Sequence, residues 1–104
     1  IDIRESTSGM KQCTSVKFSG HALRRMFERS LSTEEVIFTI QTGETITDYP
    51  DDKPHPSELR LGWVDDKPVH VVVAQNQENN ECYVITAYVP SPDIWKEDFK
   101  TRRN

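Results

Sequence analysis

The sequence predicts an α+β domain in which two N-terminal helices pack on one face of a four-stranded antiparallel sheet, followed by a short C-terminal helix. Two observations lead to this prediction. Up to Gly43 the hydrophobic residues recur at helical spacing behind capping signals, whereas from Glu44 onward they alternate with polar residues, as in strands. Short polar stretches separate the predicted strands, which is typical of antiparallel hairpins. A chain of 104 residues has the length of a single domain.

The two helices are predicted from their capping residues. Ser19 is placed to cap a helix at about residues 21–29, in which the hydrophobic side chains form one stripe. Ser32 and Glu35 have the spacing of a capping box for a second helix, and Gly43 is a typical stop. A short strand at residues 16–18 is also compatible with the pattern.

Four strands are predicted after Gly43, in the stretches ETITDY, SELRLGWV, PVHVVVAQ and CYVITAYV. The stretch SPDIWKEDFK predicts a helical turn that packs back on the sheet. If residues 65–67 form a three-residue hairpin loop, Gly62 lies opposite His70 and the odd-numbered strand residues face the helices. The even-numbered residues then share the other face: Glu58, Arg60, Gly62, His70, Val72, Cys82, Thr86 and Tyr88.

Composition narrows the cellular setting. No hydrophobic run approaches the ~18 residues of a membrane span, and no secretory signal pattern is present. Cys13 and Cys82 lack the spacing of a metal site, so we predict free thiols in a reducing cytoplasm. Residues 1–9 are polar and aperiodic, and we expect a disordered tail or a cloning remnant there, with one domain at 10–104.

The charge distribution is uneven. A formal net charge of −4 argues against a general nucleic-acid binder. Basic residues nevertheless concentrate in segments 17–29 and 96–104, which is compatible with RNA contacts. The candidate RNA-binding residues are Arg24, Arg29, Lys100, Arg102 and Arg103.

The predicted polar sheet face has the residue types needed to cleave RNA without a metal. Histidine exchanges protons near neutrality, and arginine binds phosphate through forked hydrogen bonds. A base would remove the ribose 2′-OH proton, cations would stabilise the phosphorane, and an acid would protonate the leaving 5′-oxygen. The candidate catalytic residues are His21 and His70 for proton transfer, Arg25 and Arg60 for the phosphate, and Thr86 or Tyr88 for orientation.

These residues also have structural explanations. His70 could equally be a half-buried histidine bonded to the backbone, and the row His21, Arg25 and Arg29 fits a solvated helix edge. Thr86 and Tyr88 fit strand propensity alone. A protein-binding module that uses the polar sheet face is therefore the alternative to an enzyme. The histidines are widely spaced and no carboxylate pair has ligand spacing, so no metal or other cofactor is predicted.

Three stretches resemble a known bacterial family. GHALRRMFERSLSTEEVIFTIQTGETI, PSELRLGWVDDKPVHVVVA and YVITAYVPSPDIW are similar to the family called domain of unknown function 4258 (DUF4258). The similarity covers nearly everything from Phe18 to Phe99. Its motifs are H-x-x-x-R-x-x-x-R, P-V-H-V-V and I-T-A-Y-x-P, which supply His21, Arg25, Arg29, His70, Thr86 and Tyr88.

Such proteins resemble the RelE-like and barnase-like ribonucleases (BECR fold). The resemblance therefore implies a toxin of a type II toxin–antitoxin pair, a metal-independent endoribonuclease that cleaves mRNA, free or on the ribosome. It also implies a partner, a cognate antitoxin such as a YgiT-type zinc-finger protein. A family member that keeps only the fold is the other possibility, because fold alone does not establish activity.

Overall fold

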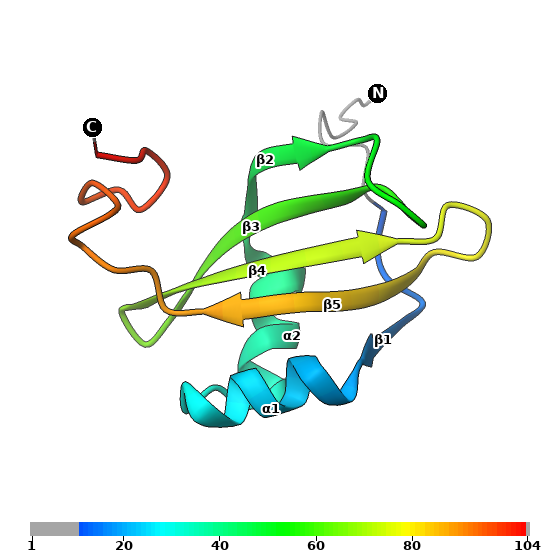
Figure 1. Cartoon of the computed structure of the whole chain (residues 1–104), viewed down its shortest axis with the longest axis horizontal. Helices are drawn as coiled ribbons and strands as arrows, with labels where there is room; N and C mark the ends of the chain where they lie inside the picture. The colour runs from blue at the N-terminus through cyan, green and yellow to red at the C-terminus, as the bar shows by residue number, and fades with distance from the viewer. Residues whose placement is uncertain (1–10, 104) are drawn as a thin grey trace.

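The computed structural model of the protein describes residues 11–103 and consists of two helices on one side of a five-stranded sheet (Figure 1). The strands are β1 (Ser15–Phe18), β2 (Glu44–Tyr49), β3 (Ser57–Val64), β4 (Lys67–Gln75) and β5 (Glu81–Tyr88). The helices are α1 (Gly20–Glu28) and α2 (Thr33–Thr42). The expected tail at residues 1–9 lies outside the described residues.

The sheet has the order β1-β5-β4-β3-β2, and only the β1–β5 pair is parallel. The predicted four-stranded antiparallel sheet is therefore wrong, although the α+β class is correct. Residues 15–18 reach the sheet edge and pair with residues 81–84, which adds the fifth strand. Helices α1 and α2 connect β1, at one edge of the sheet, to β2 at the other edge, so the parallel partners β1 and β5 are far apart in the chain and need no hairpin.

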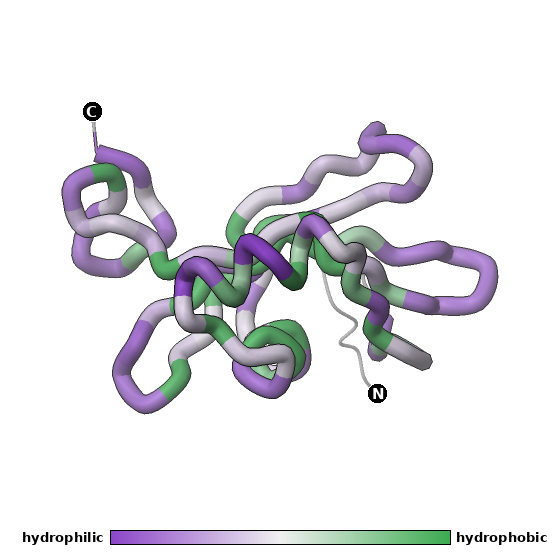
Figure 2. Tube along the Cα trace, turned by 60° about the horizontal axis from the view of Figure 1, so that its bottom comes forward, coloured by the Kyte–Doolittle hydropathy of each residue, from purple (hydrophilic) through white to green (hydrophobic). Residues whose placement is uncertain are grey.

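Both helices begin where their caps predict. The Ser19 side chain accepts a hydrogen bond from the main-chain nitrogen of Ala22, and Ser32 and Glu35 form a complete capping box. The buried faces of α1 and α2 pack on the same side of the sheet. The shared core contains Ala22, Met26, Leu31, Val36, Ile40, Val69, Val71, Val73, Cys82, Val84 and Ala87. Figure 2 shows hydrophilic residues in the projecting hairpin connections and hydrophobic residues where helices and sheet meet.

The β3–β4 hairpin differs from the prediction by one residue. Its loop contains only Asp65 and Asp66, with φ of 50° and 68°, so Val64 pairs with Lys67 and Leu61 pairs with His70. Two positive φ values are typical of a tight hairpin turn whose twist matches that of the strands. Arg60 and Gly62 therefore face the helices, and Leu61 shares the other face with His70.

A β-bulge in β5 changes which residues of this strand face the helices. The pairing shifts between Val72 and Val73, which lie opposite Thr86 and Val84, so Ile85 is the extra residue. Val84 and Ala87 both face the helices, whereas Ile85 is 43% exposed. The predicted core positions Tyr83, Ile85 and Val89 are thus wrong, and Ala87 is correct.

The segment after β5 forms an irregular hook, in place of the predicted C-terminal helix. Trp95 and Arg102 make an isolated antiparallel bridge, and the Arg103 main-chain nitrogen donates to the Ile94 carbonyl. The Asp98 carboxylate accepts from the main-chain nitrogens of Lys100 and Thr101, which turns the chain back on itself. The hook lies beyond the end of β5, where it brings Trp95 and Phe99 to His70 (Figure 1).

Cys13 and Cys82 form a disulfide, so the predicted free thiols are wrong. The bond joins the segment before β1 to the start of β5, next to the parallel pairing of these strands. Disulfides persist mainly in oxidising compartments, so the argument for a reducing cytoplasm loses its basis. Within residues 11–103, neither helix is long and apolar enough to cross a membrane.

Candidate functional site

His70 is at the centre of the sheet face opposite the helices, and it is completely buried. Its neighbours on β4, Val69 and Val71, point into the helix-covered core, so strand alternation directs the imidazole to the other side. There the Trp95 ring stands edge-on to it, with ring centroids 4.6 Å apart. The hook thus converts an open sheet face into a closed site for this side chain.

Two hydrogen bonds determine the state of the imidazole. Nε2 lies 2.8 Å from the carbonyl oxygen of Phe99, which can only accept, so Nε2 carries a hydrogen. Burial lowers the pKa of His70 and so favours the neutral ring. The hydrogen bond to Phe99 acts in the opposite direction but has the smaller effect. In the neutral tautomer Nδ1 is an acceptor, and it lies 3.2 Å from the Tyr88 hydroxyl. Tyr88 therefore donates to His70.

Tyr88 connects the buried His70 ring to the surface, because the Tyr88 side chain is only partly buried. It pairs with His70 across β4 and β5. Burial raises the pKa of the Tyr88 hydroxyl and the neighbouring Tyr49 adds to the rise, while the positive charges of Arg102 and Arg29 oppose it. Tyr88 is thus a protonated phenol at neutral pH, and the positive charges of Arg102 and Arg29 act on its hydroxyl.

Arg29 reaches the site from the C-terminal end of α1. One guanidinium nitrogen lies 2.9 Å from the Ala87 carbonyl oxygen and 3.4 Å from the Thr86 hydroxyl oxygen. Arg29 can reach this part of β5 because β1 pairs with β5 only as far as Val84. Arg102 approaches from the hook, where its guanidinium stacks 5.4 Å from the centre of the Trp95 ring.

The structure brings together five of the predicted site residues: Arg29, His70, Thr86, Tyr88 and Arg102. His21, Arg24 and Arg25 do not join them: all three are exposed on α1, and no hydrogen bond or ion pair among the described residues connects them to the site. His21 lies eight residues before Arg29, which is about 12 Å along the helix axis. Arg60 lies on the helix side of the sheet, where it pairs with Glu58 at 3.0 Å.

The remaining basic residues of the hook make local contacts. Lys100 pairs with Glu44 on the surface at 3.1 Å. The Arg103 side chain donates to the carbonyl oxygens of Pro92 and Trp95, which stabilises the hook.

Two contributors to the site were not predicted from the sequence. One is the carbonyl group of Phe99, for which a residue pattern offers no signal. The other is Tyr49, which ends β2 and lines a cleft of about 670 Å³ beside the site. The cleft is lined by Asp48, Tyr49, Pro50, Asp51, Asp52, Ser57, Val72 and Ile85. Among the described residues, no group of three or more His, Cys, Asp or Glu side chains is arranged to hold a metal ion.

The protein-family model described as domain of unknown function (DUF4258) matches residues 18–89. The chain belongs to the DUF4258 family. The matched region runs from the end of β1 to the residue after β5, so it includes Arg29, His70, Thr86 and Tyr88 but ends before the hook. No curated protein and no solved structure matches this DUF4258 domain.

Proposed function

We propose that this DUF4258 domain is the toxin of a type II toxin–antitoxin pair and a metal-independent endoribonuclease. The reaction takes place on the sheet face opposite the helices. The proposal also includes a cytoplasmic location for the protein. The observation that supports it is the Tyr88 hydroxyl, which is bonded to neutral His70 and is acted on by the positive charges of Arg29 and Arg102. A partly exposed tyrosine whose hydroxyl is acted on by two permanent cations is suited to a phosphodiester.

In the proposed reaction Tyr88 contacts the substrate and His70 acts through it. The Tyr88 oxygen takes the proton of the ribose 2′-OH while its own proton passes along the existing hydrogen bond to His70 Nδ1. The 2′-oxygen attacks the phosphorus, the bond to the 5′-oxygen breaks, and a 2′,3′-cyclic phosphate forms. Arg29 and Arg102 stabilise the negative charge. The leaving oxygen takes a proton from water, and the hydroxide that remains is neutralised when His70 returns its proton through Tyr88. The Phe99 carbonyl holds the imidazole in the tautomer that this step needs.

The neighbouring cleft suits one nucleobase. Tyr49, Val72 and Ile85 give it apolar surface on which a base can stack. Its three aspartates, Asp48, Asp51 and Asp52, would repel a second phosphate. The site thus fits recognition of RNA at one nucleotide, and the net charge of −4 fits a substrate presented by the ribosome better than naked RNA.

Removal of one hydroxyl tests the proposal. Purified protein is incubated with RNA and with ribosome-bound mRNA, and the products are assayed for 2′,3′-cyclic phosphate ends. Tyr88→Phe should reduce cleavage about 100-fold or more, as for loss of a proton-transfer group. Tyr83→Phe is the matched control, because it removes another hydroxyl of β5, one bonded to Glu81. Intact RNA after incubation of the unsubstituted protein with both substrates would overturn the proposal.

A second candidate function, binding of a partner protein, is favoured by one observation on α1. Phe27 is 85% exposed and Leu23 is 43% exposed, next to exposed His21, Arg24 and Arg25. An apolar stripe with basic borders suits an acidic amphipathic segment, and in a toxin that segment would belong to the antitoxin. Co-expression with the product of the adjacent gene should give a complex that Phe27→Lys abolishes. The exposed substitution Lys17→Glu on β1 should leave that complex intact.

A further inference from the structure

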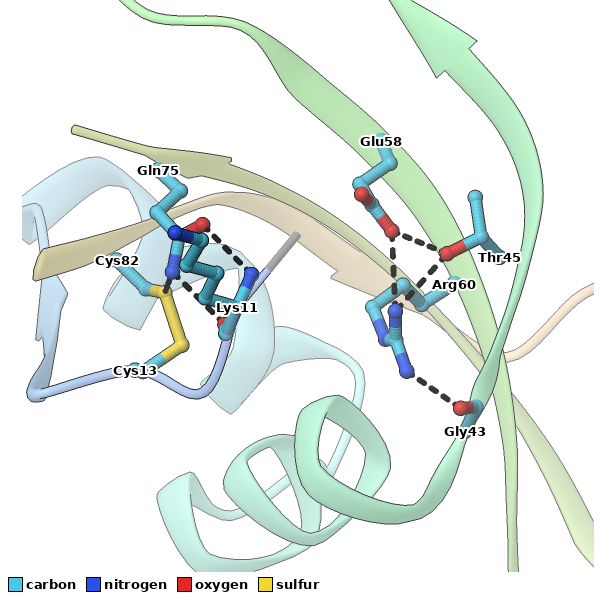
Figure 3. Close-up of polar contacts among 8 residues, drawn as sticks. All are labelled: Lys11, Cys13, Gly43, Thr45, Glu58, Arg60, Gln75 and Cys82. Carbon is cyan, nitrogen blue, oxygen red and sulfur yellow. Dashed lines mark hydrogen bonds and ion pairs between the residues drawn. A yellow bond between two sulfur atoms is a disulfide. The ribbon is translucent and has the colours of Figure 1, made fainter. Parts of the chain in front are cut away.

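The two cysteines of the disulfide have different surroundings. Cys82 lies at the start of β5 and is completely buried in the core. Cys13 lies in the segment before β1, is only partly buried and lines a cavity on the helix side of the sheet. Figure 3 shows the disulfide between that segment and β5. A molecule in the cavity thus meets Cys13, whereas Cys82 is shielded by the core.

The cavity has the size to admit a small molecule. Its volume is about 580 Å³, which is within the range of ligand pockets. It lies between the segment before β1, helix α2 and strand β3. None of the described residues that line it is acidic, so they do not repel the carboxylates of a peptide. The lining residues are Lys11, Gln12, Cys13, Val16, Ile40, Gln41 and Arg60.

The buried sulfur has both a hydrogen-bond donor and an acceptor beside it. Nε2 of Gln75, a donor, lies 3.5 Å from Sγ of Cys82. The carbonyl oxygen of Asn80 lies 3.9 Å from the same sulfur. The Gln75 amide would stabilise a Cys82 thiolate, and the Asn80 carbonyl would accept the hydrogen of the thiol that forms from it. Cys82 is therefore well placed to leave when its bond to Cys13 breaks.

Gln75 is itself fixed in place. It is buried, its Nε2 donates to the Lys11 carbonyl at 2.8 Å, and its Oε1 accepts from the Lys11 main-chain nitrogen at 3.0 Å (Figure 3). The second hydrogen of the amide is shared between the Cys82 sulfur and the Asn80 carbonyl oxygen, both 3.5 Å from Nε2. The donor for Cys82 is thus in position before any thiol arrives.

We propose that Cys13 is a modification site, at which a small peptide thiol of the glutathione class forms a mixed disulfide. The incoming thiol loses its proton, and its thiolate attacks Sγ of Cys13 from the cavity. A bond forms between these two sulfurs, the Cys13–Cys82 bond breaks, and Cys82 takes up a proton. One disulfide replaces another, so no further oxidant or reductant is needed. The exchange removes the covalent link between β5 and the segment before β1, and it does not depend on RNA cleavage.

Mass spectrometry of the unsubstituted protein tests the proposal. The oxidised protein is incubated with excess reduced glutathione, and samples are quenched in acid at early times, because protonation of thiolates stops the exchange. Peptide mapping should find glutathione on Cys13 and a free thiol at Cys82. An intact disulfide, an adduct mainly on Cys82, or reduction without any adduct on Cys13 overturns the proposal.

Two single-cysteine variants provide the matched comparison. Cys82→Ser leaves Cys13 alone, Cys13→Ser leaves Cys82 alone, and each is treated with oxidised glutathione. Folded Cys82→Ser should form the adduct at least about tenfold faster than folded Cys13→Ser, because a buried thiol is inert. The difference should disappear in urea, where both thiols are exposed. Equal rates for the two folded variants, or a ratio that persists in urea, overturn the proposal, and the mapping of the unsubstituted protein decides if a variant does not fold.

Discussion

The Tyr88 hydroxyl donates to Nδ1 of His70 over 3.2 Å, across two neighbouring strands. This direction follows from the opposite ring nitrogen, which must give its hydrogen to the Phe99 carbonyl. A buried, neutral histidine is therefore connected to the surface through a single phenol. The stability of the fold and the proposed chemistry both depend on this arrangement.

Stability should fall as the solution becomes acidic. The pKa of His70 is lowered by burial in the folded state, so below the usual value of 6.5 the unfolded chain binds a proton that the folded chain does not. The free energy of unfolding should thus decrease from about pH 6.5 down to the folded-state pKa and level off below it. Urea denaturation at a series of pH values measures this slope. His70→Asn should flatten it, and an unchanged slope in that variant would show that other groups cause the effect.

Substitution of Gly62 should destabilise the packing of α2 on β3. A Cβ at residue 62 would lie 2.8 Å from Thr39 Cγ2 and 3.0 Å from Thr39 Cα. Thr39 is completely buried, so Gly62→Ala should cost about 1–3 kcal/mol of unfolding free energy. Gly20→Ala is the control, since nothing lies within 4 Å of its Cβ position. Equal stability of the two variants would contradict the observed facing of Gly62.

Reduction of the disulfide should lower the melting temperature. Cys13 and Cys82 are separated by 69 residues, and a loop of that size corresponds to about 4 kcal/mol in the chain-entropy model. Calorimetry with and without a reducing agent measures the difference. Cys13→Ser should melt like the reduced protein and should not respond to the reductant. A response of that variant would mean that the reductant acts elsewhere.

Loss of the buried ion pair should be far more costly than loss of a surface pair. Glu58→Ala leaves the Arg60 charge uncompensated between α2 and the sheet, and should cost about 3 kcal/mol or more. Glu44→Ala removes the exposed pair with Lys100 and should cost less than about 1 kcal/mol. Chemical denaturation of the two variants gives the comparison. Similar losses would mean that Glu58 is more solvated than the structure indicates.

The helices could be predicted from the sequence because their signals are local. The interactions of Ser19, Ser32 and Glu35 span three residues, and the structure reproduces them. The parallel pairing of β1 with β5 joins residues more than sixty positions apart, and residues 15–18 alone do not encode their partner. The sequence pattern is compatible with a short strand at residues 16–18, but the place of that strand in the sheet depends on long-range contacts that a local pattern does not contain.

The candidate site was predicted in part, and the error at Arg60 has a simple physical origin. Strand alternation has a period of two, so one residue more or less in a turn exchanges the faces of a whole strand. The Asp65-Asp66 turn moved Arg60 to the helix side in this way. His70 and Tyr88 pair on the face away from the helices, which is the face that the strand pattern predicts for both. Arg29 joined them because it lies at the end of α1, whereas His21 lies at its beginning.

The Phe99 carbonyl has a consequence for comparisons within the DUF4258 family. It belongs to the main chain, at a residue with a φ of 55°, so the side chain at this position does not provide the bond to His70. Homologues could carry glycine or asparagine there, which tolerate this conformation well, and still fix the same tautomer. The proton on His70 is therefore determined by the path of the main chain in the hook, which lies beyond the matched residues 18–89, and not by the side chain at position 99.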